Sequence, residues 1–137
     1  MLAGQAFANA PVGAVHALAY PLGGHFHLSH GHSNALVLVE VLKFNAPKAK
    51  QYYAELMQLL DPRSTGCTDG LCDLFIDHMQ NHLDQSGLTL KLKDLDIPKA
   101  KLPQLAKDAL LQTRLLQNNP RELTEQDALQ IYQAIYA

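Results

Sequence analysis

The sequence predicts an all-α domain of about six helices, and three observations support this prediction. Apolar residues recur at helical spacing along most of the 137 residues. No two alternating apolar segments flank a hairpin turn signal. Proline, glycine and asparagine occur at intervals that suit the ends of helices. A chain of this length is expected to form one domain with a substantial core.

The N-terminal segment, residues 2–8, is small and apolar on most sides. This composition predicts a helix that is buried all round. Asn9 and Pro11 mark its boundary with the next helix. Because a chain that begins with core-like residues is unusual, we expect this sequence to be cut from something longer.

The second helix is expected over residues 12–20, where apolar residues form one stripe and His16 and Tyr20 share a face. Pro21 and the following glycine pair are expected to end it. Residues 25–28 alternate polar and apolar, which predicts a short extended link. Ser29 is then suited to cap the next helix.

Residues 31–45 are apolar almost all round, which predicts a central helix packed on several neighbours. Ala46 and Pro47 are expected to form a joint before a separate amphipathic helix over residues 47–60. The later elements are expected to be a helix over residues 69–85, a connector over 89–97, a helix from Pro98 to Leu111, a turn at 118–120, and a last helix capped by Thr124 with Asp127 three residues on.

Composition excludes several classes of function. The formal net charge is −2, from 11 basic and 13 acidic residues, and no like-charge block suits nucleic acid. No window resembles a membrane span, and the N-terminus lacks a targeting signal. Cys67 and Cys72 are not spaced as a redox or zinc motif. A cytoplasmic protein is the default expectation. Motifs for nucleophilic catalysis or for a dinucleotide-binding unit are not found in the sequence.

The histidines are concentrated, with four of the seven between His16 and Gly31. Imidazole is a common ligand of first-row divalent metals. A helix carrying His16, a reversal, and a next helix that starts at His30 would bring two rings together. The alternative is a pair of hydrogen-bonded histidines with no metal.

The other histidines carry weaker signals. His25 and His27 point to one side of the expected link, toward a cleft or solvent, and His32 suits a cap or a surface. His78 and His82 stand at i and i+4 on one helix, a spacing that binds metal adventitiously, but they have no third ligand nearby in sequence.

Two segments resemble the C-terminal helical domain of the iron-containing alcohol dehydrogenases, a dehydroquinate synthase-like fold. They are NAPVGAVHALAYPLGGHFHLSHGHSNALVL, residues 9–38, and LLQNNPRELTEQDALQIYQAIY, residues 115–136. The resemblance extends over essentially the whole chain. It implies that residues 1–137 form the C-terminal all-helical metal-binding domain of such an enzyme.

Members of this family join that domain to an N-terminal α/β domain that binds NAD(P). The resemblance implies a metal, Fe(II) or Zn(II), held by one Asp and three His between the domains. His16 and His30 fall on the last two ligands. Tyr20 falls where many members have another His. This difference puts a histidine-based proton relay in doubt, whereas the phenol of Tyr20 can still donate a hydrogen bond.

The first two ligands of the family pattern are an Asp and a His four residues apart, and no His in this sequence has an Asp at that distance. We therefore expect an incomplete metal site, no NAD(P)-binding domain, and a chain that is inactive alone. The alternative is a non-catalytic helical module. In either case exposed apolar surface favours a homo-oligomer or a partner that carries the N-terminal half.

Overall fold

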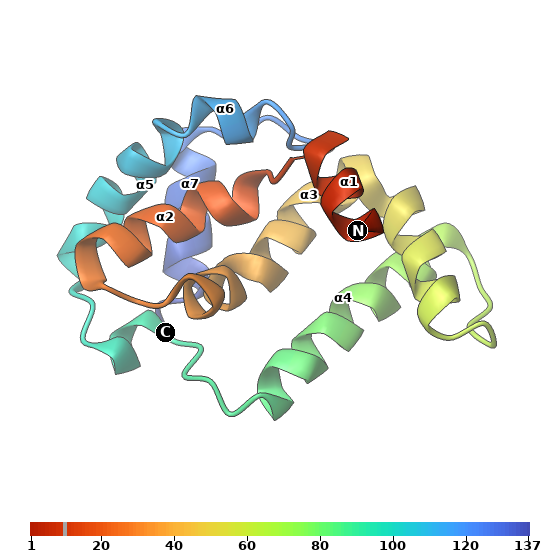
Figure 1. The fold of residues 1–137 in the computed structure, drawn as a ribbon. Coiled ribbons are helices and arrows are strands. Elements are labelled where there is room, and N and C mark those ends of the chain that lie inside the picture. Colours follow the sequence, from red (N-terminus) through yellow and green to blue (C-terminus); the bar gives the residue numbers. More distant parts are fainter. Residues whose placement is uncertain (10) are drawn as a thin grey trace.

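The computed structural model describes residues 1–9 and 11–137, and these residues form seven α-helices, two 3-10 helices and no strand. The elements are, in order, α1 (Leu2–Asn9), α2 (Ala14–Phe26), α3 (His30–Leu60), α4 (Thr68–Gln85), η1 (Leu92–Leu95), η2 (Lys99–Lys101), α5 (Leu102–Leu110), α6 (Thr113–Leu116) and α7 (Glu125–Ala134) (Figure 1). The all-α prediction is confirmed. The single-turn helix α6 was not predicted.

Two apolar clusters share the long helix α3. The larger one joins α2, the first half of α3, α5 and α7. The smaller one joins the second half of α3 to α4, which runs back alongside it (Figure 1). Helix α3 therefore connects the main bundle to a two-helix arm.

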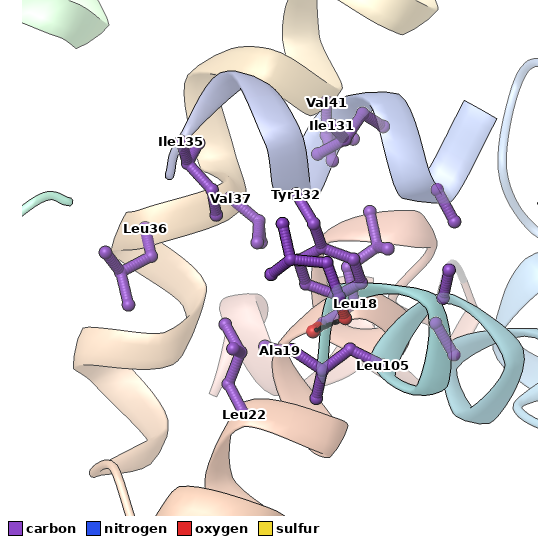
Figure 2. Packing of buried hydrophobic residues seen from close by; sticks show 14 of the residues in the cluster. Leu18, Ala19, Leu22, Leu36, Val37, Val41, Leu105, Ile131, Tyr132 and Ile135 are labelled. Atoms are coloured by element: carbon purple, nitrogen blue, oxygen red, sulfur yellow. Dashed lines mark hydrogen bonds between the residues drawn. The ribbon is translucent and has the colours of Figure 1, made fainter. Parts of the chain in front are cut away.

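Tyr132 of α7 lies at the centre of the larger cluster, fully buried. Figure 2 shows its ring extending from α7 toward Leu18 of α2 and Leu105 of α5. Its hydroxyl donates a 2.6 Å hydrogen bond to the backbone carbonyl of Leu18. Burial raises the pKa of this hydroxyl, which keeps it protonated as a donor. One side chain thus links two helices through packing and a hydrogen bond.

The prediction that the second helix ends at Pro21 is wrong. Helix α2 continues through Pro21 and the two glycines to Phe26, and His27 ends it in the left-handed region at φ 56°. The first half of the predicted extended link, His25 and Phe26, is therefore helix, and only His27 and Leu28 lie outside it. Proline removes one helical hydrogen bond and crowds the preceding turn, but Pro21 and Leu22 are both buried. Their packing holds the helix together.

The predicted joint at Ala46 and Pro47 is also wrong, because α3 is one 31-residue helix with Pro47 inside it. Arg121 contacts this part of α3 from outside. Its Nη1 donates a 2.9 Å hydrogen bond to the carbonyl of Phe44, in the turn before Pro47. The guanidinium also lies over the Phe44 ring, 4.1 Å from its centroid.

A polar junction connects the start of α2, the middle of α3 and the turn before α7. Asn119 accepts hydrogen bonds through Oδ1 from the backbone N–H of Ala14 and from Asn45 Nδ2, and its own Nδ2 donates to Asn45 Oδ1. A Cβ on Gly13 would come within 3.2 Å of Asn119 Oδ1, so glycine allows this close approach. The junction satisfies the polar atoms of Asn45, which is buried.

Other predictions from the sequence hold. Ser29 caps α3 by accepting from the His32 backbone N–H, and Thr124 and Asp127 form a reciprocal capping box at α7. Residues 2–8 form a helix as expected, yet the prediction that it is buried all round is wrong. Leu2 and Phe7 expose more than half of their surface, because α1 makes few contacts with the other described elements. Among the described residues, no helix is long and apolar enough to cross a membrane.

Candidate metal centre

His16, in the first turn of α2, and His30, at the start of α3, face each other. The left-handed residue His27 reverses the chain, and Ser29 starts α3 at His30. The two helices then run side by side (Figure 1). The two imidazole rings lie 5.0 Å apart between centroids, with an interplanar angle of 55°. The sequence-based expectation that this reversal brings two rings together agrees with the geometry.

Asn34 connects the two rings. It stands one helical turn after His30, and its Nδ2 lies 3.1 Å from His30 Nε2 and 3.4 Å from His16 Nε2. Both ring nitrogens are therefore directed at a single point. Asn34 was not predicted from the sequence, although its i+4 spacing from His30 is a signal that could have identified it.

The protonation state of His16 suits metal binding. Burial first, and then the neighbouring His30, lower the pKa of His16 below the ordinary value of 6.5. The neutral ring is thereby favoured, and the neutral imidazole is the form that binds a metal. Two convergent imidazoles fit a first-row divalent metal as partial ligands.

Tyr20 lies beside this pair. It follows His16 by one helical turn, and its ring centroid is 6.3 Å from that of His16 and 6.0 Å from that of His30. Its residue surface is 42% exposed. Its phenol is thus placed close to the two rings and open to an incoming molecule.

A hollow of about 350 Å³ adjoins Tyr20. Apolar side chains form much of its wall, including Phe7, Val12 and Leu115. Arg114 and Asn118 add polar groups at the same hollow. The site therefore combines a pair of imidazoles, a phenol and an adjacent partly apolar space.

The remaining histidines lie elsewhere. His25 pairs with Asp108 of α5 at 2.6 Å, His27 is the exposed end of α2, and the ring of His32 contacts the carbonyl of Thr89 at 2.6 Å. The structure therefore gives none of these three a place beside the His16–His30 pair.

His78 and His82 contact each other on α4, with ring centroids 4.4 Å apart. Within residues 1–9 and 11–137, no group of three or more His, Cys, Asp or Glu side chains could hold a metal, either here or at the His16–His30 pair. Each pair of histidines is thus limited to two ligands of these types among the described residues.

The sequence matches the iron-containing alcohol dehydrogenase family, C-terminal part, over residues 1–136. The chain belongs to this family. It spans about a third of the length of the curated relatives it matches. Long-chain-alcohol dehydrogenase 1 of Geobacillus thermodenitrificans is 37% identical over 99% of this chain and 35% of the relative. The 1,3-propanediol dehydrogenase of Klebsiella pneumoniae is 31% identical over the same shares.

Solved structures of iron-type alcohol dehydrogenases have the same fold as this chain. A 1,3-propanediol oxidoreductase superposes with a TM-score of 0.91 at 31% identity, covering 98% of this chain and 35% of the other. An alcohol dehydrogenase from Oenococcus oeni gives 0.88 at 31% identity, covering 99% and 36%. These likenesses confirm the resemblance inferred from the sequence.

Proposed function

We propose that this chain forms the metal-binding helical part of an NAD(P)-linked alcohol dehydrogenase that interconverts an alcohol and an aldehyde. The convergence of His16 and His30 on one point supports this proposal most directly. In this proposal the two Nε2 atoms hold Fe(II) or Zn(II) as the last two of four ligands. The first two, an Asp and a His, belong to a segment with the family pattern that this sequence does not contain.

When bound, the metal supplies Lewis acidity toward the substrate oxygen. The chain's own residues supply position. His16 and His30 fix the place of the metal, while the Tyr20 phenol, beside both rings, donates a hydrogen bond to the substrate oxygen. The hollow next to Tyr20 receives the carbon chain of the alcohol. NAD(P) binds to an N-terminal α/β domain, and the 137 residues are inactive without it.

Metal binding by the isolated chain tests the role of the pair. Calorimetric titration of the metal-free chain with Zn(II) is expected to show weak binding at one site that His16→Ala and His30→Ala each abolish. The matched control is His82→Ala, which removes a histidine from the other pair, on α4. If His82→Ala abolishes the binding while His16→Ala leaves it intact, the metal role of the His16–His30 pair is wrong.

Turnover is tested separately. The pure chain with Fe(II) or Zn(II) and NAD(P)H is expected to reduce no aldehyde. Robust turnover by the chain alone would contradict the proposed division of the enzyme. Activity that appears when an α/β segment carrying an Asp and a His four residues apart is added would support it.

The chain is proposed to associate with a copy of itself or with a chain that carries the N-terminal half. Large apolar side chains are exposed on α1 and along the α3–α4 arm, including Phe7, Tyr52 and Leu59, and such surface favours association. Light scattering is expected to give a mass above that of one 15.1 kDa chain. A strictly monomeric chain would contradict self-association. The alternative function expected from the sequence, a non-catalytic module, is not favoured by the family match. The cytoplasmic location stays a prediction.

A further inference from the structure

Asn34 carries an amide whose hydrogen-bonding capacity matches the two histidines. Its NH₂ group has two N–H donors, and two Nε2 atoms lie within 3.4 Å of its nitrogen. Its Oδ1 is buried and, within the part of the chain that the structure describes, has no hydrogen-bond partner. In the structure the amide nitrogen, and not the oxygen, lies toward both rings. An under-satisfied carbonyl is tolerated more readily than an orphaned N–H group, so the buried Oδ1 is compatible with this orientation.

This orientation determines where the protons of the two rings lie. A nitrogen that accepts a hydrogen bond carries no proton, so a neutral imidazole must then be protonated at Nδ1. We propose that Asn34 is a positioning residue that holds both His16 and His30 in the Nδ1–H tautomer, with their Nε2 lone pairs converging. The two rings are then prepared to bind one cation before it arrives. The tautomers follow from the hydrogen bonds alone, and only the description of the rings as metal ligands rests on the proposed function.

Helical geometry supports this role. Asn34 and His30 lie on the same face of α3 because they are four residues apart. Asn34 also reaches across to α2, where His16 stands 18 positions earlier in the chain. The bond to His16 therefore exists only when α2 is folded back on α3, and the tautomer of His16 reports that packing.

Long-range ¹⁵N–¹H NMR of histidine-labelled chain, free of metal, measures the tautomers. At about pH 8.5, well above the ordinary histidine pKa of about 6.5, His16 and His30 are expected to show an unprotonated Nε2. In Asn34→Leu, which keeps the volume and removes the donors, both rings are expected to approach the tautomer ratio of the exposed His27 in the same spectrum. In Asn34→Asp, which can only accept, Nε2–H is expected to predominate. Asn81→Asp on α4 controls for the added charge.

Two results would overturn the inference. One is a predominant Nε2–H form of either ring in the unchanged chain, which would mean that the amide faces the rings with its oxygen. The other is an unchanged Nδ1–H form of both rings in Asn34→Leu, which would mean that another group sets the tautomer. Dispersed backbone amide signals in each variant establish that it is folded. Because no metal is present, failure here is distinct from failure of zinc binding by the histidine pair.

Discussion

Helices α2 and α3 each continue through a proline, but different side chains support them. In α2 the turn before Pro21 is supported by Tyr132, whose hydroxyl donates to the Leu18 carbonyl in the buried core. In α3 the turn before Pro47 is supported by Arg121, whose guanidinium donates to the Phe44 carbonyl at a partly buried position. In both cases the supported carbonyl lies three residues before the proline.

The difference between them lies in burial. Pro21 is buried and the hydroxyl that supports its helix is fully enclosed, whereas Pro47 is exposed and its supporting side chain is only partly buried. An unpaired carbonyl in an enclosed site costs more than one that water can reach. The comparison indicates that the fold depends more on the support of α2 than on that of α3. Helix α2 carries His16, so the same dependence extends to the candidate metal centre.

Removing the Tyr132 side chain should have the largest effect. Tyr132→Ala leaves a cavity in the core and removes the hydrogen bond to the Leu18 carbonyl, and we expect a loss of about 4 kcal/mol in the free energy of unfolding. Tyr132→Phe keeps the ring and should cost about 2 kcal/mol. Urea denaturation followed by circular dichroism measures both. If Tyr132→Phe is as stable as the unchanged chain, the hydrogen bond does not support α2.

Replacing Arg121 should have a smaller effect. Arg121→Met keeps an unbranched apolar stem but loses the donor to the Phe44 carbonyl and the contact with the Phe44 ring. We expect a loss of about 1.5 kcal/mol. Arg121→Lys, which keeps the charge but not the planar donor group, serves as the control. Its free energy of unfolding should lie between those of the unchanged chain and Arg121→Met. A larger loss from Arg121→Met than from Tyr132→Phe would reverse the comparison.

Replacing each proline with alanine should separate the two helices further. Pro47→Ala restores a backbone donor at an exposed position, and we expect a gain of about 1 kcal/mol from helix propensity, reduced by the greater freedom of the unfolded chain. Pro21→Ala also removes buried ring contacts, so its gain should be smaller or absent. Thermal unfolding of the two variants compares them directly. Equal gains would show that the burial of Pro21 contributes nothing.

Acid should slightly weaken the hydrogen bonds that Tyr132 and Arg121 make to α2 and α3. The reason is that the cap of α7 lies between these two residues in the chain. Hydrogen bonds from the Thr124 side chain and backbone hold the pKa of Asp127 below its ordinary value. A lowered carboxyl pKa means that this stabilisation is complete above the ordinary range and is lost as the pH falls through the folded-state pKa. Stability measured from pH 5 down to about pH 2.5 should decline less in Thr124→Ala. An identical decline would exclude this cap as a cause.

Much of the architecture could be predicted from local patterns. The capping residues Ser29 and Thr124 were identified because their hydrogen bonds involve only neighbours in the chain. The His16 and His30 pair was identified because one reversal between two helices separates them. The role of Asn34 also lay within reach, since half of it is an i+4 contact.

The sequence by itself determined the all-α class, the helix caps and the family. Only the tertiary structure decided that α2 and α3 continue through Pro21 and Pro47, and that α1 is exposed. The reason is how far apart along the chain the interacting residues lie. A proline ends a helix when nothing stabilises the turn before it, and here Tyr132 and Arg121 donate hydrogen bonds to those turns from 114 and 77 residues away in the chain.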